Sequence, residues 1–131
     1  MRTMQRVGAT LAVATLAAVG VLMGVIAETA DRVAVMYAGR IVEIGPVLEV
    51  IHHPAHPYTR GLMGSIPSIV AEREELAQID GSMPRLTAIP NGCAFHPRCP
   101  HVFERCRRER PELASVGETR AACWLHQSAS P

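Results

Sequence analysis

The stretch that decides the fold is GCAFHPRCPHVFERCRRERPELASVGETRAACWL, residues 92–125. It contains all four cysteines of the chain, Cys93, Cys99, Cys106 and Cys123, separated by five, six and sixteen residues. Apart from two phenylalanines and the single tryptophan, it has few large apolar groups with which to build a core. A loop-rich, proline-containing segment of this kind needs a covalent or metal staple, because burial alone does not offset the chain entropy. We therefore expect the four sulfur atoms to converge and to hold the tail in shape.

Four convergent thiols suit several kinds of staple. Thiolates are a soft ligand set for zinc or for an iron–sulfur cluster, and four cysteines also allow three alternative pairings into two disulfides. Zinc modules usually place their cysteines in closer pairs than those seen here. The arginine-rich run 104–110 would supply compensating cations to a cluster, or would form the solvated face of a helix. The residues alone leave a cluster, disulfides, zinc and free thiols open.

The composition is that of one modest globular domain. The 131 residues are 48% hydrophobic and 19% charged, which excludes a disordered chain. A net charge of +1 indicates no strong field toward nucleic acid or membrane lipid, so we expect no nucleic-acid partner. The sequence has no G-x-x-x-x-G-K-S/T phosphate loop and no G-x-G-x-x-G, H-E-x-x-H or G-x-S-x-G motif. We therefore name no catalytic residue and no ATP-binding residue.

The chain begins with an apolar segment. After two arginines in the first six residues, Val7 to Ala27 runs without a charge and approaches the length of a membrane span. It is rich in alanine and glycine, which contribute little to insertion. A basic start followed by an apolar run is also typical of a signal peptide. A buried helix or strand of a larger fold and a displaced start codon are the remaining interpretations.

The middle of the chain predicts a small α+β fold. Residues 32–37 and 40–45 are two strands around an Ala38-Gly39 turn, and together they form a β-hairpin. A short helix is expected from Pro46, a second from Pro57 to Ser65, and a third after Pro100 that carries Cys106. The tail beyond is expected to be irregular.

Three histidines, His52, His53 and His56, stand among prolines just before the second helix. They invite a metal hypothesis, but the prolines hold the segment extended, so the rings need not converge. A capped turn is the favoured interpretation.

Three segments resemble a known family. Residues 30–43, ADRVAVMYAGRIVE, resemble the segment after the switch histidine of ABC-transporter ATPases. The following HPAHPYTR, residues 53–60, with Ser65-Ile66-Pro67, resembles the oligopeptide/dipeptide permease branch of that family. The tail from PNGCAFHPRCP, residues 90–100, to ACWL, residues 122–125, is similar to the C-terminal extension of the same branch. The resemblance covers about residues 24–126.

The resemblance implies the ATP-binding subunit of a peptide importer, peripheral on the cytoplasmic face of the membrane. Its partners would be a second ATP-binding subunit and the permease subunits, with the peptide substrate met indirectly. In this family the four tail cysteines are associated with a four-iron four-sulfur cluster, which carries over to Cys93, Cys99, Cys106 and Cys123. A cytoplasmic site also argues against disulfides.

The chain departs from the family in its first part. Residues 1–23 do not match, and Val21 and Leu22 stand where the switch histidine and its aspartate neighbour are expected. The Walker A, Walker B and signature motifs are absent. We therefore expect residues 1–24 to be a non-family segment, 25–70 the end of an ATPase domain and 71–131 the four-cysteine extension. ATP and magnesium belong to the whole family subunit, and we expect no ATP hydrolysis by this chain.

The function expected is that of an accessory, structural module for ATP-driven peptide transport. Two alternatives from other classes are a secreted or membrane-anchored disulfide domain and a zinc-binding interaction module.

Overall fold

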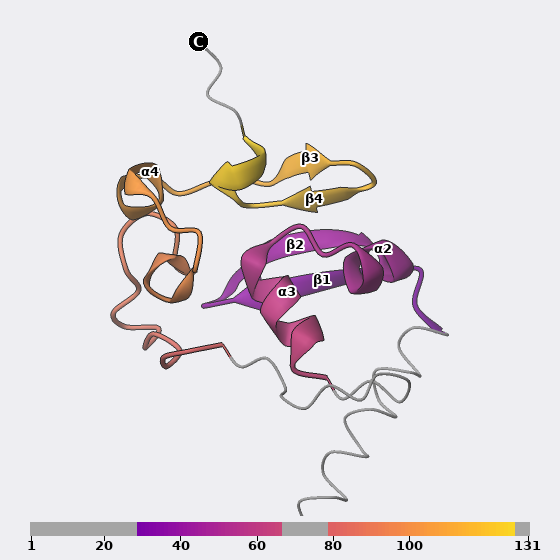
Figure 1. The fold of residues 1–131 in the computed structure, drawn as a ribbon, viewed down its shortest axis with the longest axis horizontal. Helices are drawn as coiled ribbons and strands as arrows, with labels where there is room; N and C mark the ends of the chain where they lie inside the picture. Colours follow the sequence, from indigo (N-terminus) through magenta and orange to yellow (C-terminus); the bar gives the residue numbers. More distant parts are fainter. Residues whose placement is uncertain (1–28, 67–78, 128–131) are drawn as a thin grey trace, which may run out of the picture. The chain divides into compact units, whose positions relative to one another are not determined.

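A computed structural model describes residues 29–66 and 79–127. The described residues from Asp31 onward belong to one compact unit, which contains every element named below. Four antiparallel strands make a single sheet in the order β1-β2-β4-β3 (Figure 1). Their bounds are Arg32–Tyr37 for β1, Arg40–Pro46 for β2, Ala114–Val116 for β3 and Thr119–Ala121 for β4. The interpretation of Val7–Ala27 as a span or signal lies outside the described residues.

The predicted β1–β2 hairpin is confirmed. Its two-residue turn has positive φ at both positions, 47° at Ala38 and 77° at Gly39. Two positive φ angles define the type I′ turn, whose twist matches that of the flanking strands. The register shifts by one residue between Val35 and Met36, which is a β-bulge.

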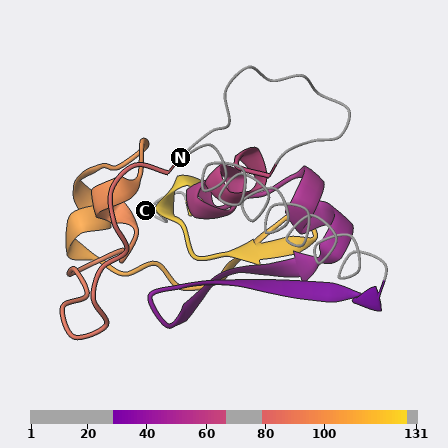
Figure 2. The same cartoon turned by 90° about the horizontal axis from the view of Figure 1, so that it is seen from below.

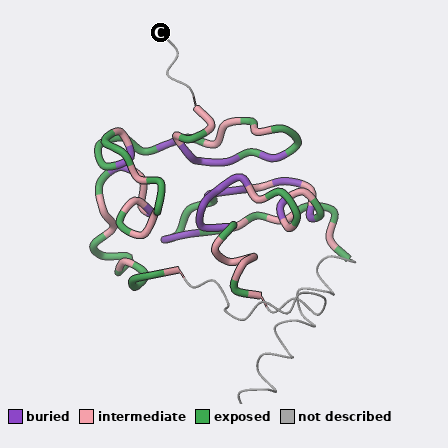
Figure 3. Tube along the Cα trace, viewed as in Figure 1, coloured by how far each residue is buried: buried purple, intermediate pink, exposed green. Residues whose placement is uncertain are grey.

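The tail contains a second hairpin, and the prediction of an irregular tail is wrong here. Strands β3 and β4 are only three residues long and meet at a two-residue loop that begins with Gly117, at a φ of 59°. Strand β4 pairs with β2, with Glu43 opposite Ala121, and Ala122 N donates to Val42 O at 2.8 Å. The tail is thereby joined to the first hairpin in one sheet, and buried residues concentrate where β2 faces β4 (Figure 3).

Helices α2, Val47–His52, and α3, Pro57–Gly64, confirm the two helices predicted after β2. Both lie on the same face of the sheet (Figures 1 and 2). Helix α3 has proline in its first turn, and its N-cap residue His56 accepts a hydrogen bond from Tyr58 N at 3.0 Å. The capped turn predicted for the histidine segment is therefore confirmed.

Between residues 79 and 127 there are three further short helices: the 3₁₀ helices η1, His96–Arg98, and η2, Trp124–His126, and α4, Glu104–Arg108. Helix α4 includes Cys106 as predicted, but begins later than Pro100. Val102 N bonds to Cys99 O at 3.3 Å, so the residues after Cys99 form a separate turn.

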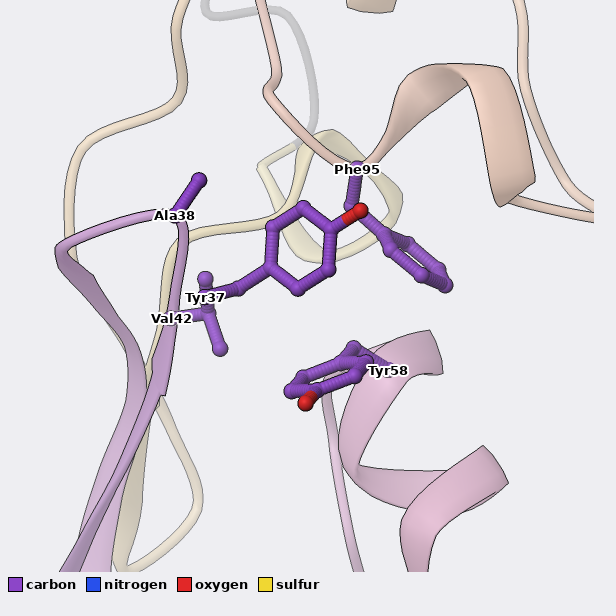
Figure 4. Close-up of a cluster of buried hydrophobic side chains, with 5 residues drawn as sticks. All are labelled: Tyr37, Ala38, Val42, Tyr58 and Phe95. Atoms are coloured by element: carbon purple, nitrogen blue, oxygen red, sulfur yellow. The ribbon is translucent and has the colours of Figure 1, made fainter. Parts of the chain in front are cut away.

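Three aromatic rings join the parts of the unit (Figure 4). Tyr37 of β1 meets Tyr58 of α3 edge-on at 4.8 Å between ring centroids, and meets Phe95 of the tail edge-on at 5.2 Å. Phe95 and Tyr58 complete the triangle at 5.5 Å. Such pairs add to the stability gained from burial alone. The α+β class is confirmed, with a core made by the hairpin, the α3 helix and the tail together.

Candidate metal centre

The four cysteines line one small cavity. Each comes from a different point of the tail: Cys93 precedes η1, Cys99 follows it, Cys106 lies within α4 and Cys123 immediately precedes η2. The cavity has room for about one water molecule, about 10 Å³. All four are free thiols in this structure. Side chains that are up to 30 residues apart in the sequence thus reach one place in the fold.

Backbone hydrogen bonds fix the segments that carry these thiols. Cys93 N donates to Cys106 O at 2.8 Å and so joins the turn before η1 to α4. His96 N donates to Cys93 O at 3.0 Å, and Cys99 N donates to His96 O at 3.4 Å. Gly92, at a φ of 71°, lets the chain pass directly against the α4 backbone. The backbone at Cys93, Cys99 and Cys106 is therefore held by main-chain hydrogen bonds.

Burial raises the pKa values of three thiols. It raises the pKa of Cys93 and of Cys99, and it raises the pKa of Cys123 to about 11. Neighbouring thiolates raise all three pKa values further, with Cys106 acting on each of them. The thiols therefore interact electrostatically, and the raised pKa values keep Cys93, Cys99 and Cys123 protonated at neutral pH.

Backbone amides oppose that rise. Hydrogen bonds from the backbone of Phe95 and His96 lower the pKa of Cys93, one from His101 lowers that of Cys99, and one from Leu125 lowers that of Cys123. In each case the backbone group lies two or three residues after the cysteine. Amide donors favour the thiolate, the form that binds metal. The donor set and its surroundings therefore fit a thiolate-bound metal centre.

The coordination sphere itself is not formed. In the ranges 29–66 and 79–127, no group of three or more histidine, cysteine, aspartate or glutamate side chains is arranged to hold a metal ion. The four thiols share a cavity without standing as a ligand set. That they bind a metal remains a prediction.

Arginines of the run 104–110 contact glutamates and Trp124. These contacts differ from the charge compensation that a cluster would need. Arg105 pairs with Glu109 at 2.8 Å and Arg108 with Glu104 at 2.6 Å, both along the exposed side of α4. The Arg105 guanidinium also lies 3.5 Å from the centre of the Trp124 ring, whose Nε1 donates to Glu109 O at 2.9 Å. These contacts match the solvated-helix interpretation, and the stacked Arg105 fixes η2 against α4.

Two buried polar residues fix the turn before α3, and the sequence analysis did not identify the first. Glu43 of β2 is fully buried, and its carboxylate accepts hydrogen bonds from Ala55 N at 2.8 Å and from His56 N at 2.9 Å. Burial and the charge of His126 lower the pKa of His56 to about 4, so the ring is neutral. His56 also lines the four-cysteine cavity. His52 and His53 are exposed, so the three predicted histidines do not gather.

Within residues 29–66 and 79–127, no helix has the length and the hydropathy needed to cross a membrane.

The comparisons with known proteins all find similarity to peptide-transport proteins. Residues 42–106 match the family described as "Oligopeptide/dipeptide transporter, C-terminal region". The dipeptide transport ATP-binding protein DppD of Caldanaerobacter subterraneus is 41% identical over 110 residues, which are 83% of this chain and 34% of that protein. A putative peptide import ATP-binding protein of Brucella ovis is 51% identical over 102 residues, 73% of this chain and 30% of that protein.

The oligopeptide transport ATP-binding protein OppD of Salmonella typhimurium is 44% identical over 100 residues, 76% of this chain and 30% of that protein. The chain thus spans about a third of the length of the curated relatives it matches.

Proposed function

This chain belongs to the oligopeptide/dipeptide transporter family, whose C-terminal region matches residues 42–106. On that premise we propose that it is an accessory module of a peptide importer. Its partners are a second ATP-binding subunit and the permease subunits, at the cytoplasmic face of the membrane. It meets the transported peptide only indirectly. The names of its relatives, peptide-transport ATP-binding proteins, support this assignment.

The module supplies structure and not ATP hydrolysis. The sequence lacks a phosphate-binding loop, so no group is available to cradle nucleotide phosphates and magnesium. The purified chain is expected to release no phosphate from Mg-ATP in a malachite-green assay. Magnesium-dependent turnover would refute this part of the proposal.

The four cysteines hold a four-iron four-sulfur cluster. The observation that carries this assignment is that Cys93, Cys99, Cys106 and Cys123 line one cavity, with backbone hydrogen bonds favouring the thiolate of three of them. When bound, such a group cross-links the four tail segments and can exchange an electron. Four protein ligands leave no open position, which supports a structural role.

Anaerobic isolation of the chain tests the assignment. Brown protein containing equal amounts of iron and acid-labile sulfide is expected, with visible absorption from sulfur-to-iron charge transfer. Cys99→Ser should lose most of the iron. Met83→Ser, which changes an exposed sulfur-containing side chain, is the matched control and should retain it. Colourless protein with no free thiols would favour a disulfide domain instead.

Zinc is the second candidate for the same site, and one observation favours it. The cavity admits about one water molecule, about 10 Å³, which is closer to the size of a single ion than to that of a four-iron core. Stoichiometric zinc without iron or sulfide in the anaerobic preparation would assign the chain as a zinc-stapled interaction module. The thiol ligands would be the same.

A further inference from the structure

The turn before α3, residues 53–56, is called the histidine turn below. It is linked to the four-cysteine cavity through His56. We infer that His56, held in place by Glu43, is a positioning residue for Cys123, so that the histidine turn and the metal centre form as one unit. This inference rests on the proposed four-cysteine centre. It assigns a role to two buried polar side chains that do not themselves bind the metal.

The first step is the attachment of the turn to the sheet. Both carboxylate oxygens of Glu43 are used, Oε1 by Ala55 N at 2.8 Å and Oε2 by His56 N at 2.9 Å. Glu43 is fully buried, so these bonds are shielded from water and each contributes more than a bond at the surface would. The backbone at residues 55 and 56 is therefore fixed relative to β2.

The second step is the orientation of the imidazole. Nδ1 of His56 accepts the hydrogen bond of Tyr58 N at 3.0 Å, which assigns the ring proton of this neutral side chain to Nε2. The backbone of Ala122 also interacts with the ring and raises its pKa, whereas burial and His126 lower it. His56 thus joins the first turn of α3 to the residue immediately before Cys123.

The third step is that Cys123 is held from both sides by the same turn. Before it, Ala122 donates its N–H to Val42 O at 2.8 Å, and its backbone interacts with the His56 ring. After it, His126 Nε2 lies 2.9 Å from Ala55 O. The His56 ring itself borders the cavity. Loss of the interaction between His56 and Ala122 should therefore free Cys123 more than the other three cysteines.

Two substitutions separate the capping role of His56 from its positioning role. In His56→Asn the side-chain oxygen stands near the place of Nδ1 and keeps the N-cap, but cannot reach Ala122. In His56→Gln the amide nitrogen reaches toward the place of Nε2 and can restore the interaction with Ala122, at the expense of the cap. The fluorescence of the single tryptophan, Trp124, confirms that each variant is folded.

Cobalt(II) is the probe, because its thiolate charge-transfer bands report how many sulfurs bind. His56→Asn is expected to weaken cobalt binding by about 10- to 100-fold and to reduce the thiolate charge-transfer intensity. His56→Gln should restore both. In a Cys123→Ser background, His56→Asn should have no further effect, because the residue acts through that cysteine.

Alkylation of the metal-free chain provides a readout that does not depend on any metal. His56→Asn should increase the rate at which iodoacetamide modifies Cys123 several-fold relative to Cys93. Unchanged cobalt affinity and unchanged alkylation of Cys123 would overturn the inference, as would equal losses in the wild-type and Cys123→Ser backgrounds. If the wild-type chain binds no cobalt through thiolates, the metal centre fails, and the alkylation rates still decide the positioning role.

Discussion

At the scale of the residue, Glu43 is the buried charge on which the histidine turn depends. Its two oxygens each accept a hydrogen bond from a main-chain N–H. In a glutamine at this position, the side-chain NH₂ group would face one of these N–H donors and could not accept its hydrogen bond. Glu43→Gln should lower the free energy of unfolding by about 2–3 kcal/mol. Urea denaturation followed by far-UV circular dichroism measures the change. Glu118→Gln, in the exposed β3–β4 loop, is the control and should be nearly neutral.

His56 makes the stability of the fold depend on pH. Because the pKa of His56 is lowered from 6.5 to about 4 in the folded chain, the unfolded chain takes up a proton at a pH where the folded one does not. Stability from this group is complete above about pH 6.5 and decreases as the pH falls toward 4, by roughly 3 kcal/mol in total. The ionisable neighbours of His56 are His126, whose charge acts on the ring, Glu43, which holds its backbone, and the four cysteines of the shared cavity.

Urea midpoints at pH 7.5, 5.5 and 4.5 measure this dependence. His56→Asn should remove most of the slope between pH 6.5 and 4.5. An identical slope in wild type and His56→Asn would show that the pH dependence of stability does not arise from protonation of His56.

The sequence indicated the four cysteines and the capping histidine, but not the role of Glu43. The cap at His56 is local, since its partner Tyr58 is two residues away and the following proline marks the helix start. The partners of Glu43 lie 12 and 13 residues further on, and the contact of His126 with Ala55 spans 71 residues. The local sequence around Glu43 does not indicate these partners, because only folding brings them to the carboxylate.

At the scale of the element, Gly92 decides how the turn that carries Cys93 meets α4. A Cβ at this position would overlap Cys106 O and lie 2.7 Å from Arg107 C, and the φ of 71° disfavours any side chain. Gly92→Ala should break the bond from Cys93 N to Cys106 O and reduce metal content together with stability. The iron or zinc recovered per chain and the urea midpoint measure the two effects.

Gly39→Ala is the matched control. Its φ of 77° is as unfavourable for alanine, but a Cβ there would meet nothing within 4 Å. We expect the same cost of about 1 kcal/mol for the left-handed backbone and no loss of metal. Equal metal losses in the two variants would show that strain alone, and not the approach to α4, explains the result.

The elements differ in how far their local sequence specifies them. The β1–β2 hairpin and α3 were predictable because a turn dipeptide, alternating side chains and a proline start lie within a few residues of each other. The β3–β4 hairpin was not, since strands of three residues are too short for a periodic pattern. Its pairing with β2 depends on a contact between Ile44 and Arg120, far apart in the chain. The gathering of the thiols likewise depends on main-chain bonds between separate turns.

At the scale of the whole molecule, the hairpin and the tail stabilise each other within residues 31–127. Strand β2 pairs on one side with β1 and on the other with β4. The aromatic triangle takes one ring from β1, one from α3 and one from the tail. Neither part retains a complete core without the other, so they should unfold together.

Thermal unfolding followed by two probes tests this cooperativity. Trp124 fluorescence reports the tail, far-UV circular dichroism reports the sheet and helices, and the two midpoints should coincide. Phe95→Leu, at a ring that is 2% exposed, should lower both midpoints equally, because lost aromatic contacts reduce the free energy of unfolding by about 1–2 kcal/mol. Phe103→Leu, at a ring that is 40% exposed in the same tail, should change neither. A tail transition that shifts in Phe95→Leu while the sheet transition stays in place would show two independent units, and the link from β2 through His56 to Cys123 would then lose its physical basis.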